Sequence, residues 1–347
     1  MIKLNPLTLK QIKRFKQIKR GYWSLIILSV MLLLSLFAEA LINSKALVVR
    51  YQGEYYFPMV SDVYSGKTFG LESSGEANYR LLQLALKDKN NGDFAILPLV
   101  PWNPYEQDFS GEYPPHAPSA YSKHYLGTDV IGRDILARLV YGFRTAMGFA
   151  LITMVIAYSI GVTVGCAMGF FGGKFDLIVQ RIIETWSMVP FLYVIMILVS
   201  IAQPTFMLFV LINVTFGWMG ITWYMRTMTY RESAREYVLA AKALGASTAR
   251  IIFHHILPNT MVMIVTLAPF TIAANITALT ALDYLGLGLI PPTPSWGELL
   301  QQGKSNLDSP WIVGSVVTAI VGVLVMVTFI GEAIRTAFDP KKYTVYR

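Results

Sequence analysis

Few residues of this 347-residue chain have the types and spacing that catalysis requires. Asp129 and Asp134 could form a carboxylate pair for acid–base chemistry, but no accompanying nucleophile or metal ligand is recognisable. The adjacent His254 and His255 would point about 100° apart on a helix, which is a poor arrangement for a shared metal ion. The single cysteine, Cys166, supports neither a disulfide framework nor a Cys/His cluster. We therefore expect no catalytic residue and no metal site in this chain.

Three polar side chains fall inside long apolar runs, namely Asn213, Asn275 and Asp283. Polar groups are costly inside a bilayer and usually face a cavity or the interior of a helix bundle. Asp283 stands just before Leu285 and Gly286, near the expected outer end of a span. We predict that Asn275, Asp283, Leu285 and Gly286 contribute to the translocation pathway or its outer gate. An ordinary carboxylate at the membrane interface is the alternative for Asp283.

The composition explains why a membrane is expected at all. The chain is 54% hydrophobic and 14% charged, with a mean hydropathy of +0.49, whereas soluble domains carry about 25% charged residues. The first apolar run is too long for a signal peptide, so we expect it to be retained. Each apolar run approaches the ~20 residues that a helix needs to cross a bilayer. We predict six transmembrane helices, at 21–42, 145–171, 185–202, 205–225, 260–288 and 311–333.

Charge decides the orientation of these spans. The net charge of +8 could indicate nucleic acid or a membrane surface, and the apolar runs favour the membrane and no nucleic acid. The segments 1–20, 172–183, 226–258 and 335–347 together carry 18 Lys and Arg residues but only four acidic residues. Positive charge is enriched in cytoplasmic loops. We therefore expect both termini, the basic 1–20 segment and the 335–347 tail, in the cytoplasm.

The remaining segments have distinct expected roles. Residues 43–138 are rich in Tyr, Pro and charged residues, which predicts a water-exposed extracytoplasmic subdomain with short strands. Residues 134–141 are predicted to form an amphipathic helix along the outer membrane surface, with Arg133, Arg138 and Arg144 snorkelling to water. Gly161, Gly165 and Gly169 share one helix face and predict close packing, either within the chain or against a partner subunit. Pro190 predicts a kink in the third span.

The loop 226–258 contains the sequence EYVLAAKALGAS, residues 236–247. Its composition favours a helix, which Gly245 can end in a left-handed cap, and Ser247 can then cap a second helix over 248–257. Its small side chains form a low-relief surface, which suits insertion into a groove on another protein. The alternative is an amphipathic helix lying on the membrane, but that would carry aromatic and basic faces that this stretch lacks.

This stretch resembles the EAA loop of ABC importer permeases, the coupling helix that fits a cleft in a cytoplasmic ATPase. The matching residues include Glu236, Tyr237, Ala240, Ala241, Gly245, Ala246 and Ser247, followed by Ile256-Leu257-Pro258-Asn259. One departure matters, because Leu239 stands where the motif's glutamate would be. An ion pair from that glutamate to the ATPase therefore cannot be carried over.

Two further segments, 124–151 and 281–300, resemble the dipeptide/oligopeptide/nickel C-type permeases, as does the GEAIRTAFDP sequence near the end. With VRYQGEYYFPM in the outer segment, they are similar to the microcin C/oligopeptide importer subfamily (Yej-type). The resemblance implies a type I importer (MetI-like) core over 139–334. It also implies membership of a bacterial cytoplasmic membrane complex that imports peptides or peptide-like compounds.

The resemblance implies several partners: a homologous second permease, one fused or two separate ATPase chains, a periplasmic substrate-binding protein and membrane lipid. ATP and magnesium would be bound by the ATPases, since the chain lacks a G-x-x-x-x-G-K-[ST] loop and no cofactor is expected in it. The substrate stays open between an oligopeptide, a microcin-like conjugate and nickel. An ion-coupled secondary transporter is the alternative function, but the chain lacks the mid-membrane carboxylates which that mechanism needs. A membrane-embedded protease is disfavoured because H-E-x-x-H and G-x-S-x-G are missing.

Overall fold

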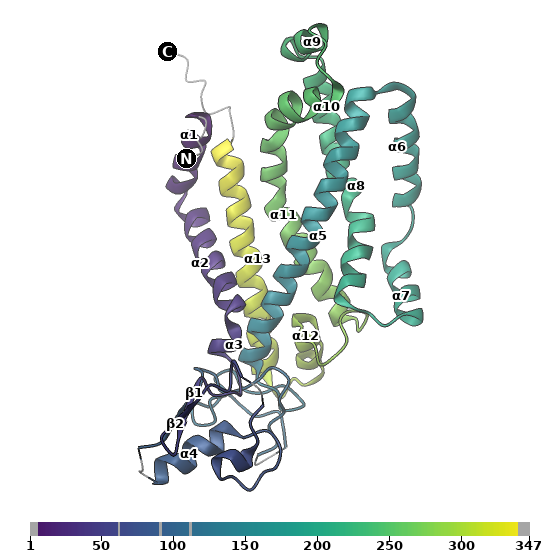
Figure 1. The fold of residues 1–347 in the computed structure, drawn as a ribbon. Coiled ribbons are helices and arrows are strands. Elements are labelled where there is room, and N and C mark those ends of the chain that lie inside the picture. Colours follow the sequence, from purple (N-terminus) through teal and green to yellow (C-terminus); the bar gives the residue numbers. More distant parts are fainter. Residues whose placement is uncertain (1–5, 62, 90–91, 111–112, 339–347) are drawn as a thin grey trace.

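The computed structural model describes residues 6–61, 63–89, 92–110 and 113–338. The chain forms an elongated helical bundle with a small mixed subdomain at one end (Figure 1). Helix α1, the C-terminal end of α13 and, apart from them, the short helix α9 lie at the other end (Figure 1). The outermost parts of the two segments predicted to be cytoplasmic, 1–5 and 339–347, lie outside the described residues.

The helices follow the apolar runs and extend beyond most of them. Their bounds are α1 Pro6–Gln17, α2 Lys19–Leu36, α3 Ala38–Leu41, α4 Tyr79–Lys89, α5 Ile135–Phe171, α6 Gly173–Ser187, α7 Phe191–Ile201, α8 Phe206–Ser233, α9 Glu236–Ala243, α10 Thr248–Arg250, α11 Leu257–Tyr284, α12 Trp296–Ser305 and α13 Pro310–Phe338, with a 3-10 helix η1 at Gly66–Phe69 and a π-helix η2 at Ile251–Ile256.

Five helical stretches in the described residues are long and apolar enough to cross a membrane, and the bent pair α6–α7 makes a sixth when it is counted as one span. The five are α2, α5, α8, the continuous 248–284 stretch and α13. This arrangement agrees with the predicted all-α membrane class. The span expected at 21–42 is divided between α2 and α3, which meet at Phe37.

The third span is broken where the sequence predicts a kink. Helices α6 and α7 meet at an angle of 66°, and Pro190, which has no N–H to donate, stands immediately before α7. The helix begins earlier than expected, at Gly173, and so includes Lys174 and Asp176. From the sequence alone, two charged residues so close together favour a loop. In the structure Asp176 forms an ion pair with Arg226 of α8, and this pair holds the first turn of α6 against the bundle.

The prediction of a separate surface helix over 134–141 is wrong. These residues form the first turns of α5, which runs without a break through Phe171. Arg133 and Arg138 do not snorkel, because they are 1% and 0% exposed. A buried arginine needs paired acceptors, and its partners here come from distant parts of the chain, as described below.

Glycines allow α5 and α8 to pack closely. A Cβ atom on Gly165 would lie 2.6 Å from the Thr222 carbonyl oxygen, and one on Gly169 would lie 2.5 Å from the Arg226 carbonyl oxygen. Gly161 faces the same helix. The small-residue stripe is therefore a packing face within this chain, which resolves the two alternatives that the spacing left open.

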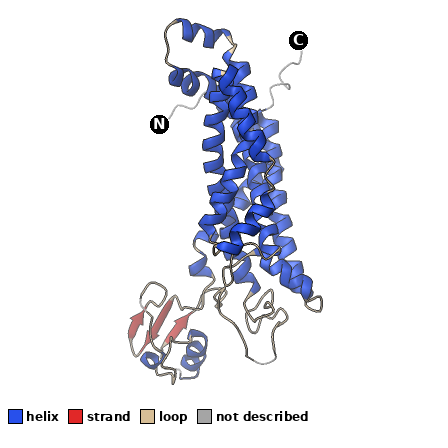
Figure 2. Cartoon of the chain, turned by 90° about the vertical axis from the view of Figure 1, so that its right-hand side faces the viewer, coloured by secondary structure: helices blue, strands red, loops and turns tan. Residues whose placement is uncertain are grey.

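The subdomain is predicted to lie outside the cytoplasm and is called the outer subdomain here. It contains a three-stranded antiparallel sheet in the order β2-β1-β3 (Figure 2). The strands are Val48–Tyr51, Glu54–Tyr56 and Phe94–Ile96. Val49 lies opposite Tyr56 and Ala95 and is fully buried, since it packs with Phe69 and α4 in a small core. The short strands expected in this segment are present.

Candidate coupling helix and pathway residues

Helix α9 lies at the tip of the bundle opposite the subdomain (Figure 1). Glu236 in its first turn complements the helix dipole. Its end is a Schellman cap, because the N–H of Gly245 donates to Lys242 O and the N–H of Ala246 donates to Ala241 O, both at 3.0 Å. Gly245 has a φ of 77°, as its predicted role requires.

The second capping prediction also matches the structure. The Ser247 hydroxyl accepts a hydrogen bond from Arg250 N, and α10 follows directly. That helix is not a free second helix, because it continues through the π-helix η2 into α11. A π-helical turn is often found at functional sites. Here it links the tip directly to a membrane-spanning helix.

One face of α9 is anchored and the other is exposed. Val238 is fully buried against Ile251 and Ile256. On the anchored side Ala241 and Ala246 pack against this small core, whereas Glu236, Ala240, Gly245 and Ser247 are exposed. Two leucines that the motif did not single out complete the exposed side, Leu239 (51% exposed) and Leu244 (88% exposed).

Tyr237 fixes the base of α9. Its hydroxyl donates to Glu232 Oε2 at 2.6 Å and accepts from Asn259 Nδ2 at 3.1 Å. Burial and the hydrogen bond to Glu232 raise the pKa of Tyr237. Glu232 and Asn259 also line a surface hollow beside the helix, together with Ala234, Arg235, Glu236 and Tyr237. Lys242 lies 4.6 Å from the centre of the Phe170 ring, which adds a contact to α5.

The four predicted pathway residues do not form one cluster. Asn275 is 9% exposed and donates to the Ala150 carbonyl, which ties α11 to α5. Asp283 is 7% exposed and accepts hydrogen bonds from Leu289 N at 2.8 Å and Ser295 Oγ at 2.5 Å. In this chain Asp283 therefore holds the loop that follows α11.

Leu285 and Gly286 lie in that loop. Leu285 is 54% exposed, and Gly286 has a φ of 72° in an exposed turn. Their gate role stays a prediction. The third polar residue noted in the apolar runs, Asn213, has a buried Nδ2 atom without a hydrogen-bond partner in the described structure.

The loop before α5 meets α12 at the junction between the outer subdomain and the bundle, called the outer junction after its predicted side. This junction holds a buried charge cluster that the sequence did not predict. Arg133 Nε donates to Asp129 Oδ2 at 2.7 Å and Arg133 Nη2 donates to Glu298 Oε1 at 2.7 Å. Arg138 pairs with the other oxygen of Glu298. The cluster joins the loop before α5 to α12, although Glu298 is 160 residues from Arg138 in sequence.

Asp134 belongs to a second buried polar group beside this cluster, together with His124 and Asp108. One of its oxygens accepts from Ala137 N at 2.7 Å and caps α5, and the other contacts His124 Nδ1 at 2.8 Å. His124 Nε2 contacts Asp108, and Trp102 stacks on the imidazole ring. Asp129 and Asp134 are thus each engaged by a structural partner. The two carboxylates therefore do not face each other as a catalytic pair would.

Comparison with known proteins identifies the family. The family described as "Binding-protein-dependent transport system inner membrane component" matches residues 161–342. The chain belongs to this family. It is a permease subunit of an ATP-binding cassette importer and a multi-pass protein of the inner membrane, as the motifs predicted.

Full-length relatives support this assignment. The chain is 41% identical over 343 residues to the "Inner membrane ABC transporter permease protein YejE" of Escherichia coli K12, with 99% of both chains covered. It is 35% identical to the "Peptidoglycan transport system permease protein YejE" of Agrobacterium fabrum, covering 97% of this chain and 94% of that one. It is 31% identical to the "Dipeptide transport system permease protein DppC" of Lactococcus lactis, covering 95% and 89%. The predicted resemblance to Yej-type and C-type permeases is confirmed.

Proposed function

We propose that this permease forms half of a translocation pathway for oligopeptides or peptide-like compounds of the microcin C type, and that α9 couples it to a cytoplasmic ATPase. The names of the relatives described above, which mention dipeptide and peptidoglycan transport, support a peptide-like substrate. The other half of the pathway would come from a homologous second permease. A periplasmic substrate-binding protein would deliver the substrate to the outer face.

The observation that carries the coupling role is the exposed apolar tip of α9. Leu244 is 88% exposed although burying a leucine side chain contributes about 1.5–3 kcal/mol. Leu239 and Ala240 lie beside it on a surface of low relief. This combination fits a preformed groove on a folded partner, with the apolar side chains as anchors. The excess of basic residues in the loop 226–258, which contains α9, supports a cytoplasmic location.

The contacts at the base of α9 provide a way to transmit movement. Lys242 contacts the end of α5, Tyr237 bonds to Glu232 of α8, and the chain after Ser247 runs without a break into α11. A displacement of α9 would therefore be passed to three spanning helices at once. ATP and magnesium would be held by the partner ATPase, either one fused chain or two, whose closure would supply that displacement.

Affinity purification in mild detergent from native membranes tests this proposal. Tagged wild-type chain should recover an ATPase and a second permease in stoichiometric amounts. Leu244→Asp should lose the ATPase and keep the second permease, because a charge on the tip opposes burial in a groove. Leu307→Asp is the matched control, since Leu307 is 77% exposed in the loop between α12 and α13. Wild-type chain recovered without any ATPase would overturn the coupling role.

A further inference from the structure

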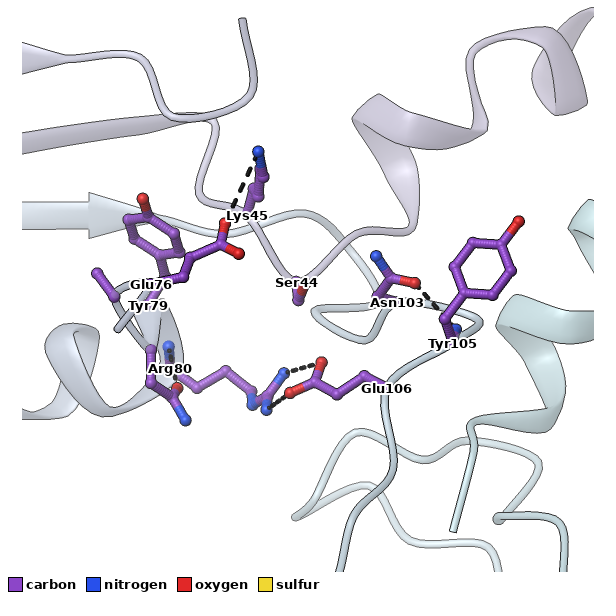
Figure 3. A pocket seen from close by; sticks show the side chains of 10 residues that line it. Ser44, Lys45, Glu76, Tyr79, Arg80, Asn103, Tyr105 and Glu106 are labelled. Atoms are coloured by element: carbon purple, nitrogen blue, oxygen red, sulfur yellow. Dashed lines mark hydrogen bonds and ion pairs between the residues drawn. The ribbon is translucent and has the colours of Figure 1, made fainter. Parts of the chain in front are cut away.

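A cavity of about 420 Å³ lies in the outer subdomain. Three segments meet around it: the residues that follow α3, the start of α4, and the loop that returns toward α5 (Figure 3). Its polar lining includes Ser44, Lys45, Glu76, Arg80, Asn103 and Glu106. Nothing in the coupling mechanism uses this cavity.

One side of the cavity is fixed by a rigid ion pair. The Arg80 guanidinium binds both oxygens of Glu106, at 3.0 and 2.5 Å, and donates to Pro101 O at 2.7 Å. It also stacks 3.7 Å above the Trp102 ring. These contacts engage three of the five N–H donors and one π-face of this guanidinium, so the Arg80–Glu106 pair is held in place as one wall of the cavity.

The second ion pair at the cavity is loose. Lys45 Nζ and Glu76 Oε1 are 3.7 Å apart, and their side chains are 30% and 47% exposed. Exposed pairs of this kind contribute roughly 0–1 kcal/mol, so their separation costs little. Neither side-chain charge has another partner among the described residues. Figure 3 shows the two groups facing each other across one corner of the cavity.

The cavity also presents oriented amide donors. The Oδ1 atom of Asn78 accepts from the N–H groups of Arg80 and Leu81, and that of Asn103 accepts from Tyr105 N. These bonds fix which way each amide points, so both NH₂ groups stay available. Neither NH₂ group has an acceptor within the described structure.

We propose that this cavity binds the α-amino-acid head group of a side-chain-linked peptide, in which one carbon atom carries both the ammonium and the carboxylate. The ammonium binds Glu76 and the carboxylate binds Lys45. Two charges that lie 3.7 Å apart match a ligand whose opposite charges are equally close, and an extended peptide with its charges at opposite ends does not match. When the ligand binds, the long ion pair between Lys45 and Glu76 is replaced by two charge-assisted hydrogen bonds to the ligand.

The remaining volume indicates how the ligand continues beyond the head group. A cavity of about 420 Å³ is larger than a head group alone, so it has room for an extension. The free NH₂ groups of Asn78 and Asn103 can then donate to carbonyl oxygens of that extension. The choice of an amide-linked extension rests on the proposed function in peptide import, whereas the head-group recognition rests on the cavity alone.

Calorimetric titration of the purified full-length chain in lipid nanodiscs tests the proposal with two isomers. γ-Glutamyl-alanine carries the head group, and α-glutamyl-alanine has the same composition and charge without it. We expect the γ-isomer to bind at least tenfold more tightly. Equal binding of the two isomers, or no binding of either, would overturn the proposal. The titration needs no ATPase, so its failure leaves the proposed import function untouched.

Three variants locate the binding. Glu76→Gln and Lys45→Gln should each weaken binding of the γ-isomer at least tenfold and leave the thermal unfolding midpoint nearly unchanged, because their mutual pair is weak. Glu54→Gln is the matched control, since Glu54 is an exposed residue of β2 whose carboxylate bonds only Tyr56 among the described residues. Unchanged binding in both cavity variants would place the ligand elsewhere on the chain and overturn the proposal.

Discussion

The two ends of the bundle place their charged residues in opposite ways. At the outer junction, Arg133, Arg138 and Asp129 are essentially inaccessible and are joined to Glu298 of α12. At the tip, Glu236 and Lys242 are not buried, and α9 is fixed to the bundle by a small apolar core around Val238, the Tyr237 hydroxyl and one cation–π contact. The difference indicates that the junction is held more firmly than the tip, which fits the proposal that the tip meets a partner and passes on its movement.

The largest effect is expected from Glu298→Ala. The substitution removes the short ion-pair partner of the buried Arg138 and leaves the buried Arg133 with Asp129 alone. Breaking a buried pair in this way costs about 3–5 kcal/mol. We expect a large fall in the thermal unfolding midpoint of the purified chain and a low yield of folded protein. Glu298→Gln keeps an acceptor oxygen and should lie between the wild type and the alanine variant.

The matched control for Glu298 is Glu184→Ala. Glu184 pairs with Arg181 at 2.6 Å, but the two side chains are 37% and 75% exposed, so the change should cost only about 0.2–1 kcal/mol. Equal destabilisation by Glu298→Ala and Glu184→Ala would show that the junction is no more firmly held than the surface.

Gly245→Pro should abolish transport while the chain stays folded in the membrane. Proline cannot adopt the φ of 77° found here, and it also removes the N–H that donates to Lys242 O. The cap of α9 is then lost, but no buried core residue changes. Peptide uptake, ATPase co-purification and membrane content of the chain should be measured together.

Gly53→Pro provides the comparison for that variant. Gly53 also has a positive φ, 85°, and lies in the turn between β1 and β2 at the other end of the molecule. This variant should keep the co-purifying ATPase. Normal uptake by Gly245→Pro would contradict the coupling role of α9.

A smaller effect is expected at Asp108, beside the junction cluster. Burial acts to raise the pKa of this carboxyl, but hydrogen bonds from Ser110 and His124 outweigh it and lower the pKa. A carboxyl whose pKa is lowered by folding stabilises the folded state at pH values above its pKa in the unfolded chain, which is about 3.9. This contribution is lost as the pH falls through the pKa of the folded state. Hydrogen bonds to a charged group contribute about 1.5–3 kcal/mol.

Asp108→Asn should therefore be less stable than the wild type at pH 5, and the gap between their unfolding midpoints should close as the pH is lowered below the unfolded value. The control is Asp308→Asn, because Asp308 is exposed. Its unfolding midpoint should differ little from that of the wild type, both at pH 5 and at a pH below the unfolded pKa. A gap for Asp108→Asn that stays constant with pH would mean that the charge of Asp108 contributes nothing to the junction.

The tip could be predicted from sequence because its signals are local. Gly245 and Ser247 act within about one helical turn of their own positions, and Pro190 stands at the break between α6 and α7. The outer junction could not be predicted in the same way. Arg138 has the local pattern of a snorkelling residue, and its burial is explained by partners distant in sequence, namely Glu298 and the carbonyl groups of Pro104 and Pro292.

Asp283 illustrates the same limit within the predicted pathway. Its position at the end of an apolar run suggests a gate, but its hydrogen bonds go to Leu289 and Ser295 in the following loop. Hydrophobic periodicity predicts which residues are removed from water. It does not report which polar groups meet across the fold, so the spans can be predicted from the sequence and the buried polar contacts cannot.

The smallest effect, and the finest test of the tip, is expected from Tyr237→Phe. The change removes the hydroxyl that bonds Glu232 and Asn259 but keeps the ring, and such hydrogen bonds contribute about 0.5–1.5 kcal/mol each. Because α9 is a peripheral element, the global unfolding midpoint should hardly move. The backbone amides of α9 should instead exchange with solvent up to about tenfold faster, since about 1.4 kcal/mol corresponds to a factor of ten. Tyr230→Phe, on an exposed tyrosine of α8, should leave that exchange unchanged, and equal exchange in all three proteins would mean that the phenol does not hold α9 in place.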